Sequence, residues 1–487
     1  MFVDRQLEMA FLNNVLTRQH PGPGQFVMMY GRRRVGKTAL LRAWAEQSGS
    51  AFTYWVAEKE PALLQRRKLF TAVLAGLAID LPVPQFESWA DLWRGIAQLA
   101  QDRRHILIID ELPYAAEADP AMLSSLQHAW DQLFQQSSAV IVICGSHVRS
   151  MELLLGRQSP LFGRMTGQWY LRALPFGVLH EFLSDWSPEE LVATYAIVGG
   201  IPAYLSWIDP RRTLTTNIRQ VMLSPGSLVL AEAAFLLQDE VREPRPYLAI
   251  LQALGNGMHT LKDIGNASMV DSAHLSFYLG QLQELRLVER RLPATQSPAQ
   301  QRRSRSGRYH LSDPFLRFYF RFLAPSAADG TLSYRPERVL PGIRQGLRAF
   351  VGATAWEELA RQWVDAAVKP ARFGMLPQTI GSHWSRHVQV DVVAVNWQTR
   401  DLLLGECRWT EDAVDRATVR ELIVTKTPLV LRDMAVDPEK WNVRFAIFAR
   451  RGATAAAREE LVLHNGILID LPELYSDLVQ SATVDPR

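Results

Sequence analysis

Short, unbroken runs of apolar residues recur in the first part of the chain. They cover 26–30, 105–109 and 139–144. Continuous apolar runs of this length are typical of parallel strands that are buried on both faces, because helices then cover the sheet on each side. The pattern therefore predicts a parallel α/β sheet near the N-terminal end.

A different pattern begins near residue 244. Helical spacing of apolar residues predicts two short helices with a break at 255–257, and then a longer helix over about 272–285. A strand-like run at 287–292 follows, and its returning partner is predicted at 309–311. Helices followed by a strand pair are the layout of a winged helix-turn-helix, which we assign to residues 244–324.

The last third of the chain returns to strand-like runs. Residues 325–342 are rich in proline, glycine, serine and alanine and predict a linker. Beyond it, a helix-like stretch at 356–360 precedes two apolar runs at 388–395 and 401–409. We therefore expect a further α/β domain over 340–487.

A glycine-rich turn follows the first apolar run. It reads Gly31-Arg32-Arg33-Arg34-Val35-Gly36-Lys37-Thr38, a complete G-x-x-x-x-G-K-T phosphate loop, and a helix is predicted from Ala39 onward. Glycines let backbone N–H groups face phosphate oxygens, the lysine reaches the β- and γ-phosphates, and the threonine hydroxyl can ligate Mg²⁺. The loop predicts an ATP site; a chance glycine-rich turn is the alternative.

The next two apolar runs end in residues that suit the same site. Asp110 and Glu111 follow the run 105–109, where Asp110 can hold the magnesium shell and Glu111 can polarise a water molecule. A solvated acidic turn is the alternative reading of this pair. Ser146 follows the run 139–144, at the place where a γ-phosphate sensor would lie, whereas we expect His147 beside it to be ordinary.

These motifs resemble the archaeal-type ATPases, a P-loop family close to the AAA+ and STAND signalling ATPases. The resemblance extends over nearly the whole chain and includes the opening segment 2–8 and the stretches 160–167 and 198–205. It implies a three-layer αβα core over 1–175 in which the sensor strand separates the phosphate-loop strand from the Walker B strand. Further strands are implied at 51–56 and 169–171, and a helical lid at 176–243.

The resemblance also suggests a role for one arginine. In similar proteins an arginine of the stretch 160–167 lies near the nucleotide, which makes Arg164 a candidate for charge stabilisation during phosphoryl transfer. The alternative is a surface arginine that caps a loop carbonyl.

The connection between the two winged-helix strands is strongly basic. It contains Arg302, Arg303, Arg305 and Arg308 within seven residues. As a wing it would contact DNA phosphates while the third helix occupies the major groove. The alternative is a solvated, mobile loop on a winged helix that serves protein contacts.

Each strand-like run of the last domain contains one acid among apolar neighbours, Asp391 in the first and Glu406 in the second. A buried carboxylate is costly unless it is paired or metal-bound, so two on adjacent strands indicate convergence on one cation.

The spacing Asp…Glu-x-Arg resembles the PD-(D/E)XK nucleases. The resemblance implies that Asp391 and Glu406 ligate Mg²⁺ and that Glu357, from the preceding helix, helps position metal or water. The place normally held by lysine is Arg408, which stays charged and can only stabilise developing phosphate charge. This departure calls strand cleavage into question and leaves metal-dependent nucleic-acid binding. A non-catalytic nuclease-like fold or an unrelated α/β domain is the alternative.

Composition narrows the class of protein. The chain has 487 residues, 48% of them hydrophobic and 21% charged, with a net charge of +3. These values exclude large-scale disorder, and the length predicts about three domains. With only Cys144 and Cys407, and no run of about 18 apolar residues, we expect a cytoplasmic protein without a disulfide framework or membrane association.

The sequence thus predicts an ATPase that needs ATP and Mg²⁺ and couples its nucleotide state to DNA binding or metal-dependent DNA cleavage. The alternative is a STAND-like switch whose C-terminal domain is non-catalytic and recruits partners. A third reading is a transcription factor whose winged helix reads one operator. Protein partners could bind the winged helix or the last domain, and in a homo-oligomer Arg164 could act on a neighbour's nucleotide.

Overall fold

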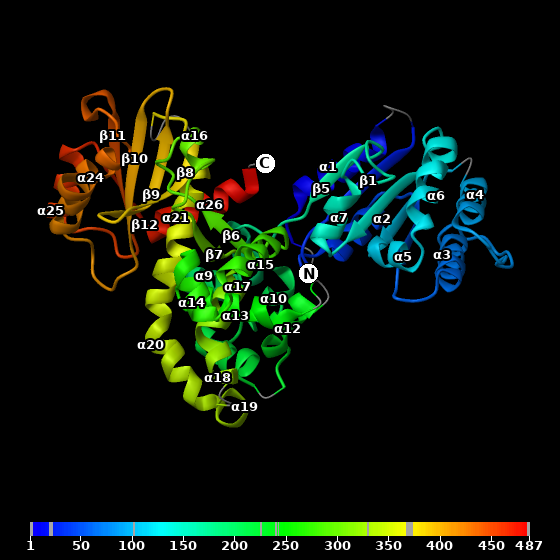
Figure 1. Cartoon of the computed structure of the whole chain (residues 1–487), viewed down its shortest axis with the longest axis horizontal. Coiled ribbons are helices and arrows are strands. Elements are labelled where there is room, and N and C mark those ends of the chain that lie inside the picture. The colour runs from blue at the N-terminus through cyan, green and yellow to red at the C-terminus, as the bar shows by residue number, and fades with distance from the viewer. Residues whose placement is uncertain are drawn as a thin grey trace. The chain divides into compact units, whose positions relative to one another are not determined.

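The computed structural model describes residues 3–484 except for 19–22, 101–102, 225, 239–240, 242, 329–330 and 367–373. The chain forms two compact units (Figure 1). The first contains the residues up to Leu174 together with Ile201–Ala203, and the second contains Pro175–Gly200 and the chain from Tyr204 onward. Phe2, which opens the segment that resembles the family, lies outside the described residues.

A five-stranded parallel sheet forms the centre of the first unit, with the strand order β2-β3-β4-β1-β5. The strands are β1 (Gln25–Tyr30), β2 (Ala51–Val56), β3 (His105–Asp110), β4 (Val140–Gly145) and β5 (Gly167–Tyr170). All neighbouring pairs are parallel. The predicted parallel sheet is confirmed, and β4 separates the phosphate-loop strand β1 from β3 as the resemblance implied.

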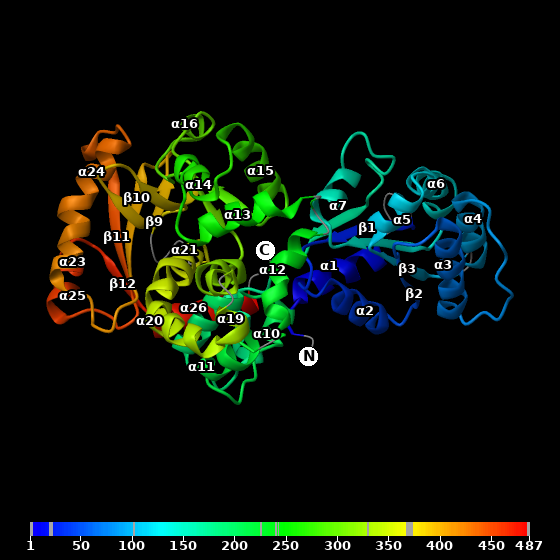
Figure 2. The ribbon, with the colours of Figure 1, turned by 60° about the horizontal axis from the view of Figure 1, so that its bottom comes forward.

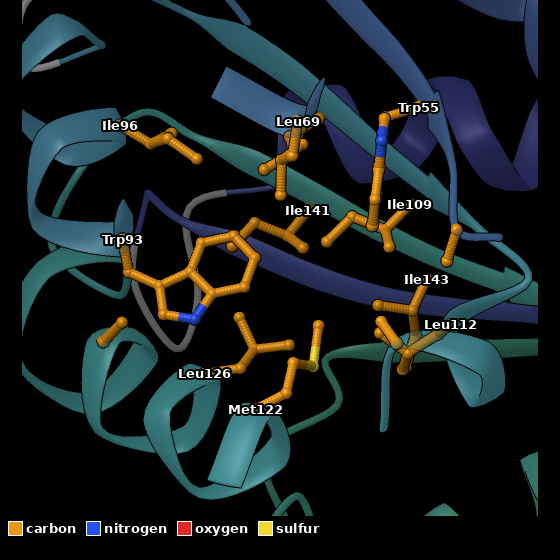
Figure 3. Packing of buried hydrophobic residues seen from close by; sticks show 14 of the residues in the cluster. Trp55, Leu69, Trp93, Ile96, Ile109, Leu112, Met122, Leu126, Ile141 and Ile143 are labelled. Carbon is orange, nitrogen blue, oxygen red and sulfur yellow. The ribbon is translucent and has the colours of Figure 1, made fainter. Parts of the chain in front are cut away.

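Helices cover both faces of this sheet (Figure 2). They are α1 (Gln6–Thr17), α2 (Lys37–Gln47), α3 (Ala62–Gly76), α4 (Trp89–Leu99), α5 (Leu112–Ala118), α6 (Ala121–Ala129), η1 (Trp130–Phe134) and α7 (Val148–Leu154). Ile109, Ile141 and Ile143 face a core that includes Trp93 and Leu126 from the helices (Figure 3). On the other face α2 packs against β2 and β3, with α1 beside it, so the three-layer αβα arrangement is confirmed.

The second unit begins with a set of short helices. These are η2 (Phe176–Val178), α8 (Leu179–Phe182), α9 (Pro188–Val198), α10 (Pro202–Leu205), α11 (Leu214–Asn217), η3 (Ile218–Met222) and α12 (Leu228–Gln238). The first two residues of α10 belong to the first unit. Helix α9 is buried from Leu191 to Val198. It starts with a capping box in which Ser187 and Glu190 satisfy each other's backbone N–H groups.

The next part of this unit has the elements of a winged helix. Three helices, α13 (Pro244–Gly255), α14 (Leu261–Ser268) and α15 (Ser272–Glu284), precede an antiparallel pair formed by β6 (Val288–Arg291) and β7 (Arg308–Leu311). Leu275, Leu279 and Leu282 of α15 are buried, as their spacing predicted. The connection between β6 and β7 contains a short helix, α16 (Pro298–Gln301).

The predicted linker at 325–342 is wrong. Within the described residues this stretch forms α18 (Ala324–Ala328), α19 (Thr331–Tyr334), η5 (Pro336–Arg338) and the start of α20 (Val339–Val351). It follows α17 (Pro314–Phe318) and η4 (Tyr319–Leu323), and α20 continues through η6 (Gly352–Trp356) into α21 (Glu357–Ala366). The small residues misled the prediction because Leu332, Val339, Leu340 and Ile343 between them supply a buried helical face.

A second five-stranded sheet closes the unit, in the order β12-β11-β10-β9-β8. Its strands are β8 (Thr379–Trp384), β9 (Gln389–Asn396), β10 (Asp401–Arg408), β11 (Asn442–Ala449) and β12 (Ile467–Asp470). The β8–β9 and β9–β10 pairs are antiparallel and the other two are parallel. The accompanying helices are α23 (Arg416–Arg420), η7 (Glu421–Lys426), α24 (Thr427–Asp433), η8 (Pro438–Lys440), α25 (Ala455–Leu463) and α26 (Leu471–Val484).

Candidate ATP site and candidate nucleic-acid site

The phosphate loop joins β1 to α2 in the conformation that its glycines allow. Gly36 has a φ of 96°, in the left-handed region, and directly precedes the first turn of α2. A Cβ atom on Gly31 would lie 2.4 Å from the carbonyl oxygen of Leu171, so only glycine fits there. Arg34 and Val35 form the tip between them, and Ala39 lies in the first turn of the helix, whose N-terminus favours anions.

Lys37 is buried within the loop. Its Nζ donates hydrogen bonds to the carbonyl oxygens of Gly31, at 2.7 Å, and Arg32, at 2.9 Å. Burial lowers the pKa of Lys37, although the acids nearby oppose that effect. An ammonium group has three N–H donors, so one remains for a phosphate oxygen.

Thr38 and Asp110 meet at the ends of β1 and β3. The Thr38 hydroxyl donates to Asp110 Oδ2 at 3.2 Å, and the Tyr54 hydroxyl donates to the same oxygen. A hydroxyl and a carboxylate side by side are the hard oxygen ligands that Mg²⁺ prefers, and Mg²⁺ bound with nucleotide phosphates needs few protein ligands. These two residues therefore fit a magnesium ion.

Sequence reasoning missed Tyr54. The residue lies on β2, next to β3, and burial together with the Asp110 charge raises its pKa, so the phenol stays a hydrogen-bond donor. The Arg42 guanidinium carbon lies 4.5 Å from the centroid of the Tyr54 ring. An aromatic residue in a strand is typical of a core, so the sequence carried no signal for a polar role.

Glu111 and Ser146 are brought together across the neighbouring strands β3 and β4. The Ser146 hydroxyl and backbone N–H donate to the two carboxylate oxygens of Glu111 at 2.5 and 3.2 Å, and His147 Nδ1 lies 3.7 Å away. Burial alone would raise the pKa of Glu111, but the hydrogen bonds from His147 and Ser146 outweigh it and lower the pKa to about 2. The carboxylate is thus a fixed anion, suited to orienting water rather than to storing a proton. His147, expected to be ordinary, belongs to this contact.

Arg164 lies on the surface of the first unit. Its guanidinium forms an ion pair with Asp131 at 2.8 Å and donates to the carbonyl oxygens of Pro160 and Phe162. These are the contacts of an arginine that caps a loop. Its role in phosphoryl transfer stays a prediction.

Arg5 is a second residue that the motif analysis did not single out. Its side chain is buried and donates to the carbonyl oxygens of Val35, in the phosphate loop, and Arg172, both at 2.9 Å. The opening segment of the chain thereby supports the loop from the side. The resemblance at residues 2–8 was the available signal.

The acids of the second unit lie on neighbouring strands. Asp391 occupies a bulge in β9, because Gly381 pairs with Val393 but His383 pairs with Val390. A bulge redirects side chains, and here Asp391 Oδ2 accepts a hydrogen bond from the backbone N–H of Cys407 at 3.0 Å.

Glu406 on β10 is held by two cations. Arg408 donates to one of its oxygens at 2.8 Å and Lys426 to the other at 2.7 Å. Lys426 ends η7, which packs on this face of the sheet, and sequence reasoning missed it because it follows Glu406 by 20 residues. A lysine is therefore present at this acid although Arg408 occupies the expected position.

Glu357 comes from α21. Arg361 bridges it to the backbone of β9, donating to Glu357 at 3.5 Å and to the Asp391 carbonyl oxygen at 3.0 Å. Burial and the Asp391 charge raise the pKa of Glu357 to about 7, and the same two causes raise the pKa of Glu406. Asp391 is thus near enough to both glutamates to affect their pKa values.

These acids do not by themselves fit a divalent metal. Both oxygens of Glu406 are occupied by cations, and within the described parts of the chain no three His, Cys, Asp or Glu side chains are arranged as ligands. A polar cavity of about 480 Å³, lined by Arg291, Arg317, Arg361 and Glu358 among others, lies beside α21.

The two ends of the wing, the connection between β6 and β7, are packed against the C-terminal sheet. Trp384 Nε1, at the end of β8, donates to the Ser306 carbonyl oxygen at 3.0 Å, and Thr295 Oγ1 lies 2.7 Å from His383 Nδ1. The Arg308 guanidinium carbon lies 5.0 Å from the centroid of the Trp384 ring. These contacts attach the wing near its two ends, and Arg302, Arg303 and Arg305 between them are exposed to solvent. The alternative of a solvated loop that serves protein contacts therefore stays a prediction.

Comparison with known proteins agrees with the fold and the loop. Residues 2–208 match a family described as an ATPase domain predominantly from Archaea, and residues 319–421 match one described as archaea bacterial proteins of unknown function. An uncharacterised protein of Methanocaldococcus jannaschii is 31% identical over 421 residues, which cover 85% of this chain and 89% of that protein.

The chain belongs to this family of archaeal-type ATPases; it binds nucleotide and is an ATP hydrolase. Among solved structures, a Walker-type ATPase of Pyrococcus abyssi is 20% identical, with 66% of this chain and 96% of that chain covered and a TM-score of 0.49. The ORC2 protein of Aeropyrum pernix is 15% identical, with 70% and 95% covered and a TM-score of 0.45. Among the described helices, none has the length and apolar character to cross a membrane.

Proposed function

We propose that this ATPase uses its nucleotide state to control the engagement of DNA by its second unit. Lys37 and the loop amides hold the phosphates, Thr38 and Asp110 hold Mg²⁺, and Glu111 orients the attacking water. The magnesium ion would neutralise charge on the phosphates. For Arg164 to stabilise charge on the phosphates, nucleotide binding must first release its guanidinium from Asp131.

The observation that carries the DNA part is the charge of the wing. Between Glu289 and Asp313 the chain contains six arginines and no acid. Arg302, Arg303 and Arg305 are exposed, and their side chains have no partner among the described residues. Arginines that are not neutralised by nearby acids are the groups that bind phosphate backbones.

A second candidate function is supported by the state of Glu406. Because Arg408 and Lys426 already neutralise this acid, the last domain could serve a STAND-like switch that recruits partners and cuts nothing. An ATPase that controls DNA engagement must bind DNA, whereas a switch that recruits partners need not.

The test is DNA binding and cleavage with Mg²⁺ or Mn²⁺, with and without ATP, on supercoiled and linear DNA. The parent protein is compared with the double variant Asp391→Ala, Glu406→Ala. A double variant of the exposed acids Asp412→Ala, Glu459→Ala in the same domain serves as the matched control.

If the parent and the Asp412, Glu459 control cleave DNA and the Asp391, Glu406 variant does not, the protein is a nuclease. ATP-dependent binding without cleavage would support DNA engagement by a domain that does not cut. Intact ATP hydrolysis with neither binding nor cleavage would contradict the proposal and favour the switch.

A further inference from the structure

We infer that the wing and the β8–β9 hairpin together form one surface that binds the phosphate backbone of duplex DNA without reading its sequence. This inference rests on the proposed function and deepens it by naming the surface and the mode of binding. We call this surface the arginine surface; its members are Arg302, Arg303, Arg305 and Arg386.

The two segments are fixed side by side at the end of β8 (Figure 1). Trp384 bonds to the backbone of Ser306, and Arg308 packs on the Trp384 ring and reaches Gln389 Oε1 at 3.5 Å. Two residues before Trp384 in β8, the Ser382 carbonyl oxygen accepts a hydrogen bond from the Ala294 N–H at 2.9 Å. Because the wing is attached to β8 along this line, its exposed arginines and Arg386 in the hairpin lie on neighbouring segments of the same unit.

The two segments that form the surface contain no acid of their own, and Asp433 of α24 pairs with the buried His383 of β8 at 3.2 Å. The wing has no acid between Glu289 and Asp313, and the hairpin lies in a second acid-free stretch, between Asp365 and Asp391. Arg386 and His387 at the hairpin tip are exposed, and the Arg386 side chain, like those of the wing arginines, has no partner in the described part of the chain. The planar guanidinium group binds phosphate oxygens in pairs, so this arrangement suits a polyphosphate chain.

Two observations favour a nucleic-acid backbone over an anionic membrane or a base-specific site. Among the described residues of 290–312 and 379–390, no large apolar side chain is exposed, whereas membrane-surface segments insert such side chains. Helix α15, the element that would read the major groove, contains no lysine or arginine. Its two glutamines hydrogen-bond inside the domain, Gln281 to Tyr247 and Gln283 to Leu279. Binding is therefore expected to depend on charge and not on base sequence.

The experiment measures fluorescence anisotropy of two duplexes of equal length and unrelated sequence across a range of salt concentrations. The full-length parent is compared with Arg386→Ala, with the triple variant of Arg302, Arg303 and Arg305 to alanine, and with all four changes combined. Arg432→Ala, an exposed arginine elsewhere in the same domain, is the matched control. Unchanged ATP hydrolysis and circular dichroism verify that each variant is folded.

We expect the parent to bind both duplexes equally. Each lost phosphate contact should lower the slope of log affinity against log salt by about 0.9, so Arg386→Ala should lower it by about 1 and the fourfold variant by about 3 to 4. The Arg432 variant should bind like the parent.

If the parent binds DNA and the fourfold variant binds it with the same affinity and salt slope, the inference is overturned. That result would not contradict the proposed function. A strong preference of the parent for one duplex would also overturn it. Failure of the parent to bind any DNA, in any nucleotide state, would contradict the proposed function and, with it, the inference that rests on it. Binding to phosphatidylserine vesicles but not to DNA would assign the surface to a membrane and overturn the inference.

Discussion

At the scale of single residues, the ATP site is organised by hydrogen bonds among its own groups. Lys37 is ordered by two carbonyl oxygens of its own loop, and Glu111 is held as an anion by Ser146. Pre-ordered groups lower the cost of reaching the reactive geometry, because little reorganisation is left for the reaction itself.

The proposed role of Glu111 can be tested by removing its charge. Glu111→Gln should lower the rate of ATP hydrolysis by about 100-fold or more and leave ATP binding nearly unchanged, because the carboxylate orients water but does not hold the phosphates. Steady-state hydrolysis and nucleotide titration measure the two effects. The exposed Glu117→Gln, six residues further along the chain, is the control, and a Glu111 variant of normal turnover would contradict the assignment.

A buried histidine predicts how stability varies with pH. His105 hydrogen-bonds Thr53 at 2.9 Å, and burial lowers its pKa to about 4. The unfolded chain takes up a proton below about pH 6.5 but the folded protein does so only near pH 4, so stability present above pH 6.5 is lost as the pH falls between these values.

The expected loss from His105 is about 2 kcal/mol between pH 7 and pH 5. Urea unfolding of the parent and of His105→Gln at both pH values measures it, since the variant should lose less stability on acidification. The exposed His128→Asn should behave like the parent, and equal losses in all three proteins would contradict the explanation.

At the scale of elements, strand order decides which residues meet. Because β4 lies between β1 and β3, the residues that follow these three strands share one edge of the sheet, and Ser146 reaches Glu111 although 35 residues separate them. In the second unit a bulge in β9 has a similar effect, since it turns Asp391 toward the backbone of β10.

Packing of the last helix gives a prediction at this scale. A Cβ atom on Gly177, in η2, would lie 2.3 Å from the Leu478 carbonyl oxygen of α26. Gly177→Ala should therefore lower the free energy of unfolding by about 1–3 kcal/mol, because backbone atoms must move apart. Thermal unfolding and proteolysis of α26 measure the effect.

Gly280→Ala in α15 is the matched control. A Cβ atom there meets nothing within 4 Å, and alanine favours a helix over glycine. The free energy of unfolding of this variant should therefore rise by about 0.5–1 kcal/mol. A destabilised Gly280 variant, or a Gly177 variant as stable as the parent, would show that these helices pack differently.

At the scale of the whole molecule, the proposal joins an ATP site in one unit to DNA contacts in the other. If nucleotide state controls DNA engagement, a non-hydrolysable ATP analogue and ADP should give different DNA affinities. The coupling requires a difference in the free energy of DNA binding between the two nucleotide states.

Lys37→Ala tests this coupling. The variant should lose most of its ATP affinity, since the ammonium contacts the β- and γ-phosphates, and its DNA affinity should no longer depend on nucleotide. Anisotropy of labelled DNA with ADP and with the analogue makes the measurement, and Lys440→Ala on the surface is the control. A Lys37 variant that binds ATP normally would contradict the ATP-site assignment, and one that keeps the nucleotide effect would contradict the coupling.

Sequence alone determined the parts of this protein in which neighbouring residues carry the information. The phosphate loop, the buried strands and the leucine face of α15 are contiguous or periodic patterns, and local backbone geometry follows from them. Asp110, Glu111 and Ser146 could be predicted because each directly follows a recognisable strand.

Only the tertiary structure decided which distant groups pair. Lys426 at Glu406, Tyr54 at Asp110, Arg164 at Asp131 and the wing on β8 are contacts between segments far apart in the chain. Hydrogen bonds and ion pairs depend on separation in space, which strand order, bulges and helix packing set, and no local pattern records that separation. For the same reason the helices at 325–342 replaced an expected linker, since their apolar residues gained partners only in the folded unit.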